Sequence, residues 1–212
     1  MFEAAFFDLD GTLVDSEALS MHTGAAAFAA QGHHDIEDLL HQLIGVDQYG
    51  SNQLIRARCP GIDIDELRRA WHEAFMLGEA EAMPLKPGAF ELVHGLAKKM
   101  PVALVTSSHR EPALKRIELV GLRPAFSAVI TRDDVTHAKP APDPYLQAAS
   151  LLGINPAKGL VFEDSEPGTQ AGFHAGMTVV QVPDLVPASG RYAHHVADSL
   201  FQGAAWAGVW PL

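Results

Sequence analysis

The sequence predicts an α/β fold, in which a parallel sheet is covered by helices on both faces and a helical cap is inserted after the first strand. Short apolar runs of strand length recur along most of the chain, and helical patterns separate most of them. Such alternation is typical of parallel sheets with helices packed on both faces. One long stretch near the N-terminus replaces this alternation with several helical patterns and almost no strand signal. We expect that stretch to form the cap.

The first strand is expected at residues 4–7, an apolar run that ends abruptly at Asp8. Further strands are expected at residues 102–106, 128–131, 160–162 and 179–182. The helices of this part are expected at residues 89–99, 111–120, 144–152 and 169–175, and a surface loop is expected at residues 184–195. Ligands bind outside the carboxyl ends of the strands in such sheets, so polar residues at these ends are the candidate site residues.

Residues 17–83 contain the helical patterns of the expected cap. The patterns cover residues 19–31, 36–44, 53–58 and 64–82, and prolines at positions 84 and 87 close the segment. The step from Gly45 to Val46 is expected to break a helix and to leave residues 47–49 on a turn. The chain therefore divides into an α/β core of residues 1–16 and 84–212 and a helical cap of residues 17–83, which is expected to lie over the strand ends.

Composition excludes several kinds of partner. The 212 residues carry a formal net charge of -11 that no lysine and arginine run offsets, so nucleic acid is not an expected partner. No apolar stretch approaches the length of a membrane-spanning helix, and the N-terminus lacks the basic region of a signal peptide. Cys59 is the single cysteine, which excludes an intramolecular disulfide. These features predict a cytoplasmic protein without a membrane partner.

The carboxylate pair Asp8 and Asp10 is the strongest local signal. It follows the first expected strand, and Gly11 allows the chain to turn so that both carboxylates can reach one site. An acidic turn after a buried strand would give the same pattern. Three further polar segments, each placed where another strand ends, favour a functional site.

These three segments follow later in the chain. Thr106 and Ser107 end the second strand, where hydroxyls and backbone amides could hold phosphate oxygens, although a simple helix cap has the same residues. Lys139 lies in a loop that two prolines stiffen, and it could neutralise a phosphate together with a nucleophile. Glu163 and Asp164 follow the fourth expected strand and could supply metal ligands.

Two carboxylates, a hydroxyl pair, a lysine and a Glu-Asp pair in this order resemble the motifs of the haloacid dehalogenase-like (HAD) hydrolase superfamily. The resemblance covers essentially the whole chain, and residues 137–177 also resemble the beta-phosphoglucomutase-like and sugar-phosphatase branch. It implies a Rossmann-like core, a helical cap at the position of residues 17–83, and the activity of a phosphoric monoester hydrolase.

By this resemblance, Asp8 is the nucleophile that attacks phosphorus and forms an aspartyl-phosphate intermediate. The implied cofactor is Mg²⁺, and its protein ligands are Asp8, Asp164 and the backbone carbonyl of Asp10. Glu163 is either a direct ligand or an acceptor for a metal-bound water, and the sequence leaves both alternatives open.

The resemblance also implies how protons and the phosphoryl group are handled. Asp10 would be the general acid and base, which protonates the leaving alkoxide and later activates water. A halide leaving group needs no proton, so an acid at this position argues for phosphoryl chemistry. Thr106, the backbone amide of Ser107 and Lys139 would bind the transferring phosphoryl group.

Polar residues of the cap are expected to select the substrate. The candidates are His22, Asp47, Gln48, Tyr49 and Asn52, although each could equally be an ordinary exposed residue. Mutases of this branch hold a second phosphate with an arginine near the place of Gln48, so hydrolysis is favoured over phosphate transfer. The histidine pairs at residues 33–34 and 194–195 are expected to be surface residues rather than metal ligands.

The function that the sequence favours is that of a magnesium-dependent phosphatase acting on a small phosphorylated metabolite such as a sugar phosphate. One alternative is a phosphomutase of the beta-phosphoglucomutase type, which would use the same core residues. Another is a non-catalytic binding protein on the same fold, which the four intact motifs disfavour.

Overall fold

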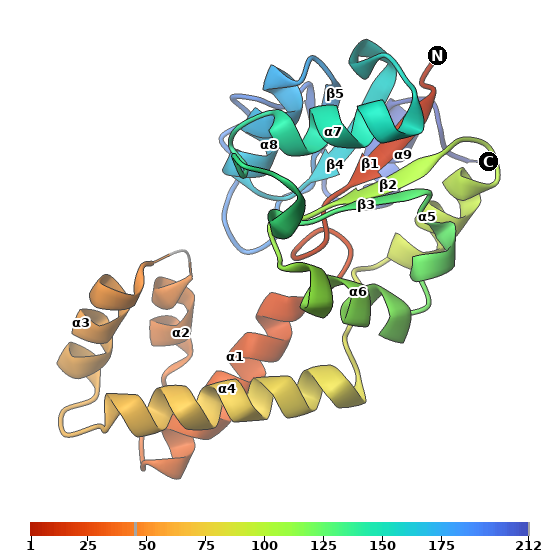
Figure 1. Ribbon diagram of the computed structural model, residues 1–212. Coiled ribbons are helices and arrows are strands. Elements are labelled where there is room, and N and C mark those ends of the chain that lie inside the picture. Colours follow the sequence, from red (N-terminus) through yellow and green to blue (C-terminus); the bar gives the residue numbers. More distant parts are fainter. Residues whose placement is uncertain (45, 212) are drawn as a thin grey trace. The chain divides into compact units, whose positions relative to one another are not determined.

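The computed structural model describes residues 1–44 and 46–211 (Figure 1). The chain divides into two compact units: Met1–Asp15 together with the chain from Pro84 onward, and Ser16–Met83. Gly45, which was expected to help break a helix, lies outside the described residues. In the described part of the chain, no helix is both long enough and apolar enough to cross a membrane.

The first unit contains a parallel sheet, and the strands of the described residues lie in the order β3-β2-β1-β4-β5-β6. Their bounds are β1 (Ala4–Phe7), β2 (Val102–Val105), β3 (Ala128–Ile130), β4 (Gly159–Glu163), β5 (Thr178–Gln181) and β6 (His195–Val196). All neighbouring strands pair in parallel, and Phe6 of β1 lies opposite Ala103 of β2 and Val161 of β4. The predicted α/β fold with a parallel sheet is therefore confirmed.

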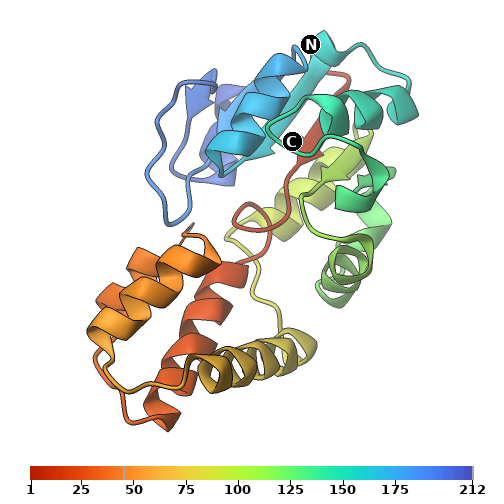
Figure 2. The same ribbon diagram turned by 60° about the vertical axis from the view of Figure 1, so that its left-hand side comes forward.

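The helices of the first unit cover the sheet (Figures 1 and 2). They are α5 (Ala89–Ala97), α6 (Arg110–Leu119), α7 (Asp143–Leu152), α8 (Glu166–His174) and α9 (Leu200–Trp206), with short 3-10 turns at Arg123–Ala125, Arg132–Asp134 and Pro156–Lys158. Helices α7 and α8 contact each other and the sheet, and their buried Tyr145 and Ala171 pack in one cluster with Phe6. Helix α5 contacts β2 and α9. The apolar strand residues are buried because helices cover them.

Two elements near the C-terminus are not predicted by the sequence pattern. Residues 184–195 were expected to form a loop, but β6 begins at His195 and pairs with β5. The strand has two residues, too few to show an apolar period. Helix α9 has seven residues, and the Ser199 side chain caps it by accepting from the Gln202 backbone N–H. Both elements depend more on pairing and capping than on a sequence period.

The second unit is helical, and its helices are α1 (Ser16–Ala30), α2 (Glu37–Leu43), α3 (Gln48–Arg58) and α4 (Ile64–Glu81). They enclose their own buried apolar cluster, which includes Phe28, Leu40, Ile55 and Leu67. The Trp71 indole N–H donates to the carbonyl oxygen of Ser20 at 2.8 Å and so links α4 to α1. This unit therefore has a core of its own.

The interpretation that residues 47–49 lie on a turn is wrong for Gln48 and Tyr49, whereas Asp47 does lie between α2 and α3. Helix α3 begins at Gln48, so Gln48 and Tyr49 belong to its first turn. The Asp47 side chain is the N-cap, and it accepts from the Gly50 backbone N–H at 2.7 Å. Aspartate is among the preferred N-cap residues, and this cap starts the helix five residues before the expected position.

The two chain segments that join the units run side by side within the first unit. Asp15 N–H donates to the carbonyl oxygen of Pro84 at 2.8 Å, and Lys86 N–H donates to that of Leu13 at 2.9 Å. Val14 and Leu85 form an antiparallel bridge between them. These bonds hold the segment that follows Asp8 and Asp10 in a fixed course.

Candidate active site

Polar side chains from distant parts of the sequence meet at the carboxyl end of β1. This strand lies between β2 and β4, and Asp8 is the first residue after it. Thr106 follows β2, Glu163 ends β4, and Lys139 comes from the segment before α7. Because neighbouring parallel strands end at the same edge, the topology gathers these residues at one place.

Asp8 and Glu163 share the ammonium group of Lys139. Lys139 Nζ donates to Asp8 Oδ1 at 2.6 Å, to Glu163 Oε1 at 2.5 Å and to the carbonyl oxygen of Val105 at 2.8 Å. The Glu163 side chain is fully buried, and those of Lys139 and Asp8 are 4% and 10% exposed. Charge-assisted hydrogen bonds of this kind are strong and directional. Three residues predicted from separate motifs are therefore in direct contact.

Burial sets the protonation behaviour of this cluster. Burial raises the pKa of Asp8 well above its usual range. The charge of Lys139 lowers this pKa, whereas the charges of Glu163 and Asp164 raise it further. Burial and the charge of Glu163 raise the pKa of Asp164 to about 7. For Lys139, burial favours the neutral amine, but the charges of Asp8 and Glu163 outweigh burial and raise its pKa. Lys139 is therefore a cation, and the excess of carboxylates favours binding of a further cation.

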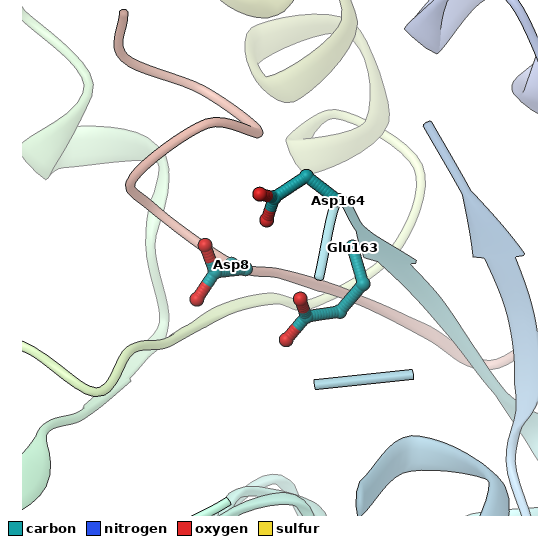
Figure 3. A group of neighbouring side chains, drawn as sticks. All are labelled: Asp8, Glu163 and Asp164. Atoms are coloured by element: carbon teal, nitrogen blue, oxygen red, sulfur yellow. The ribbon is translucent and has the colours of Figure 1, made fainter. Parts of the chain in front are cut away.

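Asp8, Glu163 and Asp164 form a group that could hold a metal ion (Figure 3). Each offers one carboxylate oxygen, and these atoms lie within 4.8 Å of one another. Figure 3 shows Asp8 with Glu163, the last residue of β4, and Asp164, the residue that follows it, beside it. Hard oxygen donors of this kind suit Mg²⁺ or Ca²⁺ rather than soft transition metals. The donor set thus fits the divalent cation that the sequence motifs imply.

Glu163 is held more tightly than the other two acids. Its Oε1 accepts from Lys139 and from the Tyr145 hydroxyl at 2.7 Å, and its Oε2 accepts from the Ser165 hydroxyl at 3.1 Å. A Cβ added to Gly168 would lie 2.0 Å from the Glu163 carboxyl atoms. The first turn of α8 therefore presses directly against this carboxylate, and only glycine leaves room for it.

Asp164 is fixed from three sides. The Thr12 hydroxyl donates to its Oδ1 at 3.2 Å, and the Gln181 side-chain amide donates to its backbone carbonyl at 3.0 Å. Gly11 has a φ of +81°, and a Cβ there would lie 2.5 Å from Asp164 Oδ2. The turn predicted at Gly11 thus requires glycine for its backbone conformation and for the space it leaves to Asp164.

Asp184 is a buried acid near this group that the sequence motifs do not predict. Lys86 Nζ donates to its Oδ1 at 2.5 Å, whereas its buried Oδ2 has no hydrogen-bond partner among the described residues. A Cβ on Gly11 would lie 3.4 Å from that Oδ2. A buried carboxylate oxygen without a donor is costly, and a nearby cation or its bound water would offset that cost.

Asp10 contacts two residues that sequence reasoning missed. The Ser108 hydroxyl donates to Asp10 Oδ2 at 2.7 Å, and Arg116 Nη1 donates to both carboxylate oxygens of Asp10 at 2.9 and 3.1 Å. Arg116 lies on α6, ten residues after Thr106. A helical pattern places an arginine on a face but does not show which distant carboxylate it reaches, so no sequence signal identified this pair.

Thr106 and Ser107 lie in the segment between β2 and α6. Thr106 is buried, and its hydroxyl oxygen accepts from the Ser108 backbone N–H at 3.0 Å. Ser107 is exposed. Because Ser108 also contacts Asp10, this segment and the segment after β1 are bonded together at the same edge of the sheet. Thr106 is therefore linked through Ser108 to Asp10.

Two candidate residues of the helical unit serve the fold of that unit. Asp47 is the N-cap of α3, and Asn52 Oδ1 accepts from Arg68 Nε of α4 at 3.0 Å. Gln48 and Tyr49 are exposed, Tyr49 by 76%. His22, on α1, lines a cavity of about 560 Å³ within this unit. The histidine pair at residues 33–34 lines the same cavity.

The family of the chain follows from comparison with known proteins. Residues 2–176 match the family model of the haloacid dehalogenase-like hydrolases. The chain belongs to this family. The match spans the Asp8 motif, the Lys139 segment and the Glu163-Asp164 pair, which are the residues that meet at the end of β1.

Relatives and solved structures agree with this membership. The chain is 32% identical to fructose-1-phosphate phosphatase YqaB of Escherichia coli K12, over 85% of this chain and 96% of the relative. A HAD family hydrolase of Deinococcus radiodurans R1, solved with bound phosphate and sodium, has a TM-score of 0.85 and 27% identity over 98% of this chain and 97% of that one. A candidate beta-phosphoglucomutase of Thermotoga maritima has a TM-score of 0.78 and 28% identity, over 92% and 94%.

Proposed function

We propose that this chain, a HAD-like phosphoric monoester hydrolase, cleaves a small phosphorylated metabolite, and that Asp8 is its nucleophile. The observation that carries the proposal is the position of Asp8. It is buried at the end of the central strand, bonded to Lys139 and adjacent to Asp164 and Glu163. A carboxylate next to a cation and a metal-ligating group is activated for attack on a phosphorus atom.

The reaction begins when a carboxylate oxygen of Asp8 attacks phosphorus and the ester oxygen leaves. This step forms phospho-Asp8, and Asp10 gives its proton to the departing alkoxide. Asp10 then takes a proton from a water that attacks the phosphorus atom. Free phosphate is released, and Asp8 and Asp10 return to their starting forms.

Mg²⁺ is the proposed cofactor, and it would supply positive charge between two anions that otherwise repel each other, the Asp8 carboxylate and the phosphoryl group. Asp8, Asp164 and the backbone carbonyl of Asp10 are its proposed ligands. We assign Glu163 a different task, which is to hold Lys139. Lys139, Tyr145 and Ser165 already donate to the two carboxylate oxygens of Glu163. These bonds favour a role in orienting Lys139 over direct binding of the metal.

Thr106, the backbone amide of Ser107 and Lys139 are the proposed phosphoryl-binding groups. Lys139 is a buried cation beside Asp8, so it can meet the negative charge that develops on the phosphoryl oxygens. Thr106 and Ser107 follow the neighbouring strand β2. Their hydroxyl and amide groups are donors of the kind that phosphate oxygens accept.

A sugar phosphate is the proposed substrate class, because a relative with 32% identity over nearly its whole length carries the name fructose-1-phosphate phosphatase. The helical segment of residues 17–83 is proposed to act as a cap that contacts the leaving group. Within it, the exposed Gln48 and Tyr49 are the best remaining candidates. The proposed location is the cytoplasm, which suits a chain with Cys59 as its single cysteine.

Metal dependence gives the first test. The purified protein should release phosphate from a panel of sugar phosphates with Mg²⁺ present and lose this activity in a chelator. Restored Mg²⁺ should restore the rate. Full activity in exhaustively chelated buffer would refute the metal role. If the panel yields isomerised sugar phosphates instead of free phosphate, the alternative function, a phosphomutase of the beta-phosphoglucomutase type, is correct.

Substitution of the proposed acid gives the second test. In Asp10→Ala, kcat/KM should fall steeply for a sugar phosphate and much less for p-nitrophenyl phosphate. This parameter reports steps up to departure of the leaving group, and nitrophenolate departs without a proton. An equal loss for both esters would contradict the role of Asp10 as acid.

A further inference from the structure

We infer that Arg116 is a positioning residue that holds the carboxylate of Asp10 in the orientation required for proton transfer. The inference rests on the proposed function, because it assumes that Asp10 is the acid and base. It concerns a residue outside the four motifs at the strand ends. Arg116 lies on α6 and reaches Asp10 across 106 positions of sequence.

The contact forms a closed set of hydrogen bonds. Arg116 Nη1 donates to Asp10 Oδ1 at 2.9 Å, to Asp10 Oδ2 at 3.1 Å and to the Ser108 hydroxyl oxygen at 3.2 Å. The Ser108 hydroxyl in turn donates to Asp10 Oδ2 at 2.7 Å. Both oxygens of Asp10 are thus engaged, which fixes the rotation of the carboxylate as well as its position.

The surroundings of Asp10 explain why such a holder is needed. Asp10 lies in the segment between β1 and α1, followed by the glycine turn at Gly11, and its side chain is 32% exposed. A partly exposed carboxylate that nothing holds samples several rotamers. Arg116 is only 13% exposed, and it comes from a helix whose Ala113 and Ile117 are fully buried. The rigid partner is therefore Arg116, and the residue that it orders is Asp10.

The same bonds connect Asp10 to the proposed phosphoryl-binding segment. The Ser108 backbone N–H donates to Thr106 Oγ1, so Ser108 links the acid to the segment that would bind the phosphoryl group. Proton transfer requires the acid to lie within hydrogen-bond distance of the ester oxygen, and small displacements are costly. Arg116 can set this distance through Asp10. It cannot act as the acid itself, because a guanidinium does not lose its proton in proteins.

The chain offers a matched set of variants for the test. Arg116→Met keeps most of the length and apolar packing of the side chain but removes the donors. Arg116→Lys keeps the charge but lacks the planar arrangement of donors. Arg110→Ala is the control, because Arg110 is the first residue of the same helix and bonds to Asp134 rather than to Asp10. Asp10→Ala provides the reference for complete loss of the acid.

The readout is kcat/KM for two esters, a sugar phosphate and p-nitrophenyl phosphate, together with the Mg²⁺ concentration that gives half-maximal activity. Arg116→Met should lower kcat/KM about tenfold or more for the sugar phosphate and less than about threefold for the nitrophenyl ester. Arg116→Lys should fall between Arg116→Met and the unaltered protein. Arg110→Ala should match the unaltered protein with both esters. The Mg²⁺ requirement should not change, because Arg116 donates to the side-chain carboxylate of Asp10, whereas the proposed metal ligand of Asp10 is its backbone carbonyl.

Three results would overturn the inference. An equal loss with both esters would mean that Arg116 supports folding or phosphoryl binding. Unchanged or increased kcat/KM for the sugar phosphate in Arg116→Met would mean that the contact does not position the acid. A change in the Mg²⁺ concentration that gives half-maximal activity in Arg116→Met would indicate that the substitution rearranges the segment after β1. Failure of the proposed function would be seen separately, because Asp10→Ala would then lower kcat/KM equally for the sugar phosphate and for p-nitrophenyl phosphate.

Discussion

The polar residues at the edge of the sheet and those of the helical unit differ in how many contacts hold their side chains. At the sheet edge, Asp8, Glu163 and Asp164 are bonded to Lys139, Tyr145, Thr12 and other donors, and they lie within reach of one another. In the helical unit, the residues predicted to select substrate are exposed, or they cap and brace their own helices. Gln48 and Tyr49 have no such structural task that the described contacts show.

This difference shows how much a residue's surroundings constrain its chemistry. A buried carboxylate must find a cation, a donor or a proton, so its partners can be tested one at a time. An exposed side chain on a helix can be changed with little effect on folding. The sheet edge is therefore expected to respond to substitution in both stability and rate, and the helical unit mostly in substrate preference.

The largest effect is expected at Lys139. In Lys139→Met, the buried Asp8 and Glu163 lose the cation that they share, and breaking a buried pair in this way costs about 3–5 kcal/mol. We expect a marked fall in the melting temperature together with loss of phosphate release. Lys158→Met is the control, because Lys158 pairs with Glu3 at the surface. Equal melting temperatures for the two variants would show that Lys139 is not a central partner of the carboxylates.

A smaller effect is expected at Gly168. In Gly168→Ala the new Cβ would collide with the Glu163 carboxyl, so α8 or Glu163 must move. Overpacking of this kind costs about 1–3 kcal/mol, and displacement of Glu163 should also lower kcat through Lys139. Gln170→Ala on the same helix is the control. The explanation fails if Gly168→Ala has the stability and kcat of the unaltered protein.

Substrate preference should change at the exposed residues of α3. Alanine at Gln48 and Tyr49 together should alter the relative kcat/KM values across a sugar-phosphate panel by several-fold, with little change for acetyl phosphate. Acetyl phosphate is the control because its leaving group is small. Unchanged ratios across the panel would remove these residues as the specificity element.

The smallest effect is expected at Asp47. Loss of an N-cap costs about 1 kcal/mol, so Asp47→Ala should lower stability slightly. Asp47→Asn should retain most of it, since asparagine is an equally good cap. A stable Asp47→Ala variant with changed substrate preference would reverse this assignment and make Asp47 a substrate contact.

The sequence predicts the sheet and its edge better than the helical unit, for physical reasons. Apolar runs that end at Asp8 or at Glu163 mark buried strands, and parallel pairing then brings their ends together. The contact between Asp10 and Arg116 has no such signal, because a side chain of α6 can reach many places. Likewise β6 has too few residues for an apolar period, and the sequence pattern does not show that the Asp47 side chain caps the start of α3.

The most direct test of the central claim is to trap the phosphorylated enzyme. Asp10→Ala should still accept the phosphoryl group of p-nitrophenyl phosphate but should hydrolyse the intermediate slowly, because the base that activates water is missing. Mass spectrometry of the rapidly quenched protein should then locate one phosphoryl group on Asp8, and Asp8→Asn should carry none and release no phosphate. A phosphoryl group on another residue, or Asp8→Asn with more than a few per cent of the original rate, would contradict the account.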